Sequence, residues 1–213
     1  MKNCSDCFLN NSALRILDCT RASLLRLRSA RTMTAGSSVV SQGAIPTYAY
    51  CLSQGRIDAI ELKLNGDHSL IFSVHRQEIF PLKALLRKEP TKFEYKTMEQ
   101  TMLCEFPIDS LRSLIVGDVA LENMLLRKAW AFEDDILKRI RTLLTPNASD
   151  KVLMTLNYFK DERDMCRFSR KEIASWTGLS LETVVRSLST LEKKKKIKKG
   201  DGEILVYGNS SKR

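Results

Sequence analysis

Residues 168–197, FSRKEIASWTGLSLETVVRSLSTLEKKKKI, decide the fold of the carboxyl-terminal part of this chain. Gly178 suits a left-handed turn between two short helices, because a residue with a Cβ atom adopts that conformation only at a cost. Ser180 follows at the place of a helix-capping hydroxyl, and Glu182 lies in the first helical turn, where a carboxylate suits the helix dipole. The pattern predicts a helix-turn-helix.

The apolar spacing predicts which side of this motif is buried. Its buried positions are Ile173, Leu179, Val184 and Leu188. The second helix would then expose Glu182, Thr183, Val185 and Arg186. In a major groove an arginine can bond guanine O6 and N7, and a glutamate can accept from the cytosine N4 amine. Arg186 and Glu182 are therefore the candidate base readers. The alternative is a surface ion pair at i and i+4, worth a few tenths of a kcal/mol.

Positive charge gathers beside this motif. Residues 151–213 hold fifteen Lys/Arg and eight Asp/Glu, which gives +7 of the formal net charge of +10. A Gly-Asp-Gly turn at 200–202 precedes an apolar segment, so residues 197–207 are predicted to form a β-hairpin wing. Lys198 and Lys199 on this wing are candidates for binding DNA phosphates. The lysine run can equally be a solvated helix end that favours the helix dipole. The candidate DNA-binding set is completed by residues at the two helix starts: Ser169, Lys171, Ser180, Thr183 and Val185.

The composition of the whole chain limits the classes of protein it can be. With 213 residues, 43% hydrophobic and 28% charged, it is expected to form two globular domains. No apolar run is long enough to cross a bilayer and the start lacks a secretory signal, so we expect a cytoplasmic protein without a membrane partner. The pI near 9.4 favours an anionic partner, here double-stranded DNA. No nucleotide-binding, metalloprotease or serine-hydrolase motif is present, which predicts a protein that is not an enzyme. An enzyme of unrecognised type remains an alternative.

The amino-terminal half alternates short apolar segments with turn signals. Residues 14–28 are predicted to form one or two short helices, and residues 31–106 a series of strands. Asn65-Gly66-Asp67 indicates a hairpin, and Pro107 ends the last strand. Strands at this interval predict a sandwich or small barrel.

Residues 108–144 have a helical pattern. An apolar stripe recurs at spacings of three and four along it: Leu121, Leu125, Ala129, Phe132, Ile136, Ile140 and Leu143. We expect it to be the seam of a dimer, and a core-facing surface is the alternative. Residues 145–149 form a hinge, and Ser149 or Asp150 is expected to cap a helix over 151–160. The predicted domains are 1–117, a linking helix over 118–146, and 147–213.

The chain thus combines a β-rich domain, a long helix and a C-terminal helix-turn-helix. In this order of parts it resembles the Crp/Fnr family of bacterial transcription regulators, and residues 181–186 match the recognition helix of that family. The resemblance implies an α+β fold with an N-terminal cyclic-nucleotide-binding-like β-barrel (jelly roll), a long dimerisation helix and a C-terminal winged helix-turn-helix. It also implies a homodimer that reads a near-palindromic site, with Glu182 and Arg186 on guanine–cytosine pairs, and RNA polymerase as a partner. The chain is most similar to the oxygen-responsive branch, which carries serine at the position of Val185.

That branch holds a [4Fe–4S] cluster on cysteines, and this chain matches the set in part. Cys4, Cys7 and Cys104 stand at ligand positions, whereas the third N-terminal position holds Ala13, and Cys19 lies further downstream. Three hypotheses stay open: a cluster on Cys4, Cys7, Cys104 and Cys19; a dithiol–disulfide switch of Cys4 and Cys7; or unliganded thiols.

The cyclic-nucleotide site of the family is also matched only in part. The family's Gly-Glu and Arg-Ser pairs correspond to Gln77-Glu78 and Thr91-Lys92 here, so Glu78 and Lys92 are the candidate ligand-binding residues. Without an arginine the bidentate contact to a cyclic phosphate is lost, and we expect no binding of cyclic AMP. The N-terminal domain is expected to receive an effector or redox input, and the alternative is a dimerisation scaffold without ligand sensing.

Overall fold

The computed structural model describes residues 17–63 and 68–207. The chain divides into two compact units, Met1–Asp134 and Asp135–Arg213, and the boundary falls inside one long helix, α4 (Val119–Leu144). Across the described residues, no helix is long and apolar enough to cross a membrane.

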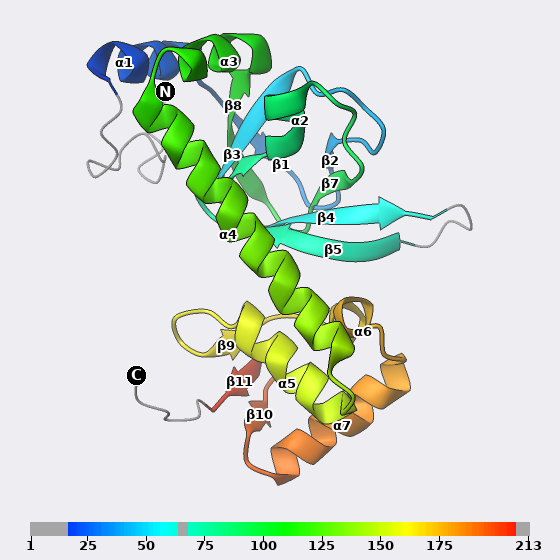
Figure 1. Cartoon of the computed structure of the whole chain (residues 1–213). Helices are drawn as coiled ribbons and strands as arrows, with labels where there is room; N and C mark the ends of the chain where they lie inside the picture. The colour runs from blue at the N-terminus through cyan, green and yellow to red at the C-terminus, as the bar shows by residue number, and fades with distance from the viewer. Residues whose placement is uncertain (1–16, 64–67, 208–213) are drawn as a thin grey trace. The chain divides into compact units, whose positions relative to one another are not determined.

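The first unit consists of two antiparallel four-stranded sheets with short helices (Figure 1). One sheet has the order β1-β8-β3-β6 and the other β2-β7-β4-β5. The elements are α1 (Asp18–Leu27), β1 (Ser29–Met33), β2 (Ser38–Val40), β3 (Tyr48–Gln54), β4 (Ile57–Leu62), β5 (His68–Val74), β6 (Ile79–Phe80), α2 (Leu82–Arg87), β7 (Glu94–Thr97), β8 (Thr101–Pro107) and α3 (Ile108–Val116). The predicted N-terminal helix and the predicted series of strands are confirmed. The predicted hairpin turn at Asn65-Gly66-Asp67 lies outside the described residues.

Two groups of side chains hold this unit together. An apolar cluster joins the first sheet to α1, α3 and the start of α4, and Leu24, Phe106, Leu111 and Leu121 within it are at most 1% exposed. Full burial of such side chains contributes about 1.5–3 kcal/mol each. Stacked rings of Phe80 and Tyr95, with centroids 5.0 Å apart, connect the two sheets. Burial raises the pKa of Tyr95, so this phenol stays protonated.

Asp118 separates α3 from α4. Its carboxylate accepts hydrogen bonds from the backbone N–H groups of Ala120 and Leu121, both at 3.0 Å, and from that of Leu17 at 2.8 Å. Burial raises the pKa of Asp118, but these hydrogen bonds outweigh that effect and hold the pKa below its usual value. The helical pattern of residues 108–144 therefore belongs to two helices, because this carboxylate caps the second one.

Part of the apolar stripe that was predicted to form the dimer seam of α4 is buried in the first unit. Leu121 and Leu125 of the predicted stripe are 0% and 1% exposed and belong to the core of the first unit, so the core alternative is right for these turns. Ile140 and Leu143, further along the same stripe, are 44% and 41% exposed. Other apolar side chains of α4 are exposed as well: Leu126, Trp130, Leu137 and Leu144.

The second unit contains α5 (Ala148–Phe159), β9 (Met165–Cys166), α6 (Arg170–Thr177), α7 (Leu181–Lys193), β10 (Ile197–Lys199) and β11 (Ile204–Val206) (Figure 1). The helix-turn-helix and the β10–β11 wing are confirmed, and β9 adds a third strand beside β11. The predicted cap of α5 was wrong. Asn147 caps this helix, because its side chain accepts from the N–H groups of Ser149 and Asp150, the two residues expected to act as caps.

Candidate DNA-binding site

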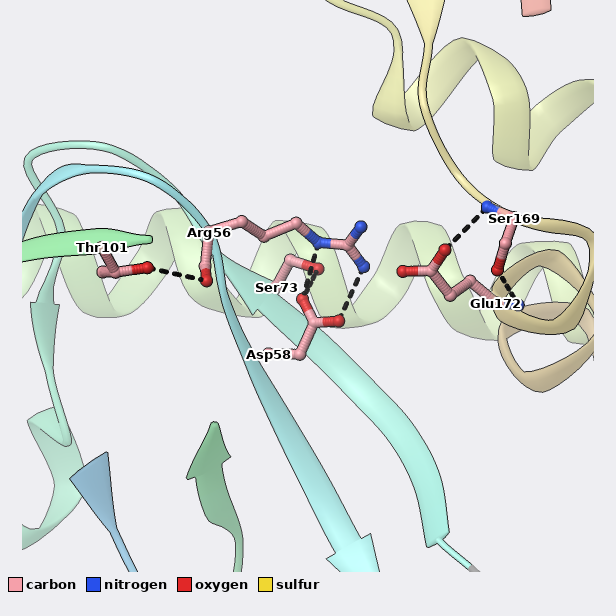
Figure 2. A network of polar contacts seen from close by, with 6 residues as sticks. All are labelled: Arg56, Asp58, Ser73, Thr101, Ser169 and Glu172. Carbon is pink, nitrogen blue, oxygen red and sulfur yellow. Dashed lines mark hydrogen bonds and ion pairs between the residues drawn. The ribbon is translucent and has the colours of Figure 1, made fainter. Parts of the chain in front are cut away.

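Side-chain caps fix both helices of the motif. Ser169 accepts a hydrogen bond from the N–H of Glu172 at 3.3 Å, and the Glu172 carboxylate accepts from the N–H of Ser169 at 2.6 Å, which completes a capping box at the start of α6 (Figure 2). Gly178 ends α6 with φ 68°, in the left-handed region. Ser180 then accepts from the N–H of Thr183 at 3.2 Å and starts α7. Each residue that the sequence predicted to shape the turn does so.

The motif rests on an aromatic cluster that the sequence reasoning missed. Trp176 of α6 is 1% exposed and stacks on Tyr158 with ring centroids 5.4 Å apart, and Phe159 stacks on Phe168 at 3.9 Å. The guanidinium of Arg139 lies 4.8 Å from the centroid of the Trp176 ring, within cation–π range. Ile173, Val184 and Leu188 are buried as predicted, and Leu179 is half-buried. The signal in the sequence was the recurrence of large aromatic residues on α5 and α6.

The opposite face of α7 is open to solvent. Arg186 and Glu182 have side chains that are 71% and 81% exposed, and their closest charged atoms are 4.0 Å apart. This separation is at the limit of an ion pair, and surface pairs of this kind contribute at most about 1 kcal/mol. Val185 is 37% exposed beside them. A guanidinium, a carboxylate and an apolar side chain are thus available together on one helix face.

The remaining candidates surround this face. Ser180 and Thr183 share a hydrogen bond between their hydroxyls at 2.8 Å, at the start of α7. Lys171 is exposed in the first turn of α6, as is Ser169 at its cap. Backbone N–H groups at a helix start carry partial positive charge, which suits phosphate oxygens. The two helix starts therefore combine hydroxyl, ammonium and N–H donors.

The two wing lysines differ in what they contact. Lys198 is exposed, whereas the ammonium of Lys199 lies 2.7 Å from the carboxylate of Glu192. The Lys199 backbone N–H donates to the same carboxylate at 3.1 Å. The side-chain and backbone hydrogen bonds from Lys199 lower the pKa of Glu192, so this carboxylate stays charged. Lys199 thus ties the wing to α7, and Lys198 has the more available charge.

The cysteine candidates do not share one environment. Cys4 and Cys7 lie outside the described residues. Cys104 on β8 is 1% exposed, packs in the apolar cluster of the first unit and is the register partner of Cys51 on β3, whereas Cys19 on α1 is exposed. Among the described residues, no three His, Cys, Asp or Glu side chains group as metal ligands. Cys104 and Cys19 thus differ in exposure, and we assign no step to an iron–sulfur cluster.

Of the two candidate ligand-binding residues, Glu78 makes a local hydrogen bond and Lys92 is exposed. The Glu78 carboxylate accepts from the N–H of His75 at 2.7 Å and so holds the turn before β6. Lys92 is exposed ahead of β7. A different polar group is buried in this unit: Arg56 donates two hydrogen bonds to Asp58, at 3.0 and 2.6 Å, and Ser73 donates to the same carboxylate at 2.7 Å (Figure 2). The hydrogen bond from Ser73 thus links β5 to β4, and the Arg56 fork engages the same carboxylate from the residue just before β4.

Comparisons with known proteins agree with this architecture. The cyclic nucleotide-binding domain family matches residues 30–118, and the Crp-like helix-turn-helix domain family matches residues 150–207. No curated protein sequence matches the chain.

Similar solved structures include FixK2 of Bradyrhizobium japonicum, with a TM-score of 0.75 and 18% identity over 85% of this chain and 93% of that one. The c-di-GMP-responsive global regulator CLP of Xanthomonas campestris has a TM-score of 0.68 and 18% identity over 90% and 99%. A CRP-family transcriptional regulator of Thermus thermophilus has a TM-score of 0.69 and 15% identity over 84% and 92%. At such identities the likeness to these structures concerns the fold. Because a cyclic nucleotide-binding domain and a Crp-like helix-turn-helix domain are both matched, and together cover more than half of the chain, the chain belongs to the Crp/Fnr family of transcription regulators.

Proposed function

We propose that this protein is a homodimer that reads a near-palindromic DNA site through α7 and regulates transcription there. The observation that carries the proposal is the exposed face of α7, where Arg186 and Glu182 project 71% and 81% exposed beside the half-exposed Val185. An exposed guanidinium near a helix start can bond guanine in a bidentate fork, and a neighbouring carboxylate can accept from cytosine. In this proposal Ser169, Lys171, Ser180, Thr183 and Lys198 contact the DNA backbone, and Lys199 supports the wing.

The proposed dimer seam is the exposed apolar side of α4. One position of a seven-residue repeat is occupied by Val119, Leu126 and Ile140 and is interrupted by Glu133, and the other is occupied by Trp130, Leu137 and Leu144. Each of these apolar side chains is at least 44% exposed. Two copies of such a repeat can pack knobs into holes, and paired recognition helices then meet two half-sites about one DNA turn apart. This seam replaces the stripe expected from the sequence and shares only Ile140 with it.

The proposed division of labour follows the three predicted segments. Residues 1–117 receive an effector or redox input, residues 118–146 carry the dimer seam, and residues 147–213 bind DNA. RNA polymerase is the proposed partner at the promoter, and the proposed location is the cytoplasm.

A second candidate is a DNA-binding protein whose β domain is a scaffold without sensing. Aromatic contacts between the second sheet and α4 favour this candidate: Phe72 packs edge-to-face on Phe93 and on Phe132 of α4, with ring centroids 5.6 and 4.7 Å apart. The two candidates differ in whether DNA affinity changes with a ligand or with the redox state of the thiols.

Substitution of Arg186 tests the proposal. Arg186→Ala should weaken binding to the cognate site by about 1–3 kcal/mol, which is roughly 5- to 150-fold, and relax the preference at one base pair. Arg186→Lys is the matched control, because it keeps the charge and loses the bidentate fork. It should retain binding to random DNA and lose discrimination at the same base pair. Fluorescence anisotropy on cognate and random duplexes measures both, and an equal loss on both duplexes would contradict base reading.

A further inference from the structure

The helix α7 ends in a defined backbone motif. Lys194 is its C-cap, and Lys195 follows with φ 53°, in the left-handed region. The N–H of Lys196 donates to the carbonyl of Leu191, and the N–H of Lys195 donates to that of Glu192, both at 2.9 Å. These two bonds make a Schellman motif, in which the left-handed position is usually glycine.

A lysine at this position is unfavourable for the backbone. A left-handed residue with a Cβ atom is strained, whereas glycine is not, and α6 ends in Gly178 with φ 68°. A second lysine, Lys88 at the end of α2, is also in the left-handed region, with φ 55°. The ammonium of Lys88 lies 2.9 Å from the carboxylate of Asp109, so an ion pair accounts for a lysine there. In the part of the chain that the structure describes, Lys195 has no such ion pair.

Neighbouring lysines already supply what the helix end requires. Lys193 and Lys194 lie in and directly after the last turn of α7, where positive charge favours the helix dipole. The dipole therefore gives no separate reason for a lysine at 195. The carboxylate nearest in sequence, Glu192, is engaged by Lys199. The charge of the exposed Lys195 side chain is left for a group outside this chain.

We propose that Lys195 binds a phosphate of the DNA backbone at the junction between α7 and the wing. The proposal rests on the proposed function, because it assigns one more contact to the same DNA-binding unit. A lysine that contacts a phosphate adds affinity and dependence on salt, and it adds no sequence preference. In this contact, the lysine that binds phosphate is the one whose backbone conformation is fixed by the Schellman motif.

The test compares Lys195→Gly and Lys195→Asn with wild-type protein. Both substitutions remove the charge and suit the left-handed backbone, so the fold should be retained or stabilised. The slope of log affinity against log salt should become shallower by about 0.9 per protomer, so about 1.8 for a dimer. Near 0.1 M salt the affinity should fall by roughly tenfold or more, equally on the operator and on random DNA. Lys88→Gly is the matched control, because it relieves the same backbone strain in the first unit and should leave DNA binding unchanged.

Four outcomes would count against the inference or against its basis. An unchanged salt slope in both variants, or a loss confined to the operator, would overturn the phosphate contact while wild-type binding stands. An equal loss in Lys88→Gly would also overturn it, because the effect would then follow net charge alone. Wild-type protein that shows no salt-dependent DNA binding would instead overturn the proposed function, and the inference with it.

Discussion

Replacing Gly178 by alanine should weaken the second unit by an amount that can be worked out from the turn. Gly178 has φ 68° and ψ 16°, and a Cβ atom there would lie 3.7 Å from Cδ2 of Leu143, an ordinary contact. The substitution therefore creates no clash, and its cost is conformational. A left-handed residue with a Cβ atom costs about 1–2 kcal/mol, and the stiffer unfolded chain offsets about half of that. We expect a net loss near 1 kcal/mol.

Urea unfolding followed by Trp176 fluorescence measures this loss. Trp176 is 1% exposed and reports on the helix-turn-helix, and a Trp130→Phe background removes the other tryptophan. A loss near 1 kcal/mol should lower the urea midpoint by about half a molar at fixed protein concentration. Gly178→Asn is the matched variant, because asparagine tolerates the left-handed region, and it should lose clearly less. Alanine as stable as glycine, or asparagine as costly as alanine, would refute the conformational explanation.

Three further predictions address the first unit, the dimer and the cysteines. Asp118→Ala should lower the free energy of unfolding by about 2 kcal/mol near neutral pH, because it removes the α4 cap and leaves buried N–H groups unpaired. The pKa of Asp118 lies below its ordinary value of 3.8, so its contribution to wild-type stability is present above about pH 4 and is lost in more acidic solution. The melting temperature of the variant should therefore fall less steeply than that of wild-type protein as the pH is lowered below about 4. Leu137→Glu should yield monomers in sedimentation velocity with unchanged circular dichroism, whereas Leu137→Met should stay dimeric; a dimeric glutamate variant would remove the proposed seam. Protein purified without oxygen should be colourless and free of iron and sulfide, because the third N-terminal ligand position holds Ala13, which cannot bind iron; stoichiometric iron would overturn that reasoning.

The helix-turn-helix could be predicted from sequence because its signals are local. Gly178, Ser180 and the apolar spacing of Val184 and Leu188 act within a few residues of the turn, and the structure places each as expected. The cap of α5 was misassigned because Asn147, Ser149 and Asp150 are all good capping residues. Which of them acts depends on where the preceding helix ends.

Other features depend on contacts between distant residues, which a single sequence does not display. The buried face of α4 follows from its packing in one cluster with Leu24 and Phe106, which lie far from it in sequence. The apolar residues of α4 can be grouped into two different stripes along the helix, and the sequence alone does not show which one is buried. The aromatic cluster beneath Trp176 likewise joins residues from three segments, and β9 is too short to carry an alternating pattern. The spacing of the cysteines likewise does not show that Cys104 is buried in the apolar cluster of the first unit.

Selection of binding sites from a random duplex library with purified protein tests the central claim most directly. If α7 reads bases in a symmetric dimer, the selected sequences should share two inverted half-sites with centres about one helical turn apart, each with a guanine–cytosine pair that Arg186→Ala no longer enriches. A selected pool with no common sequence, or a single asymmetric site that the variant enriches equally, would contradict the account.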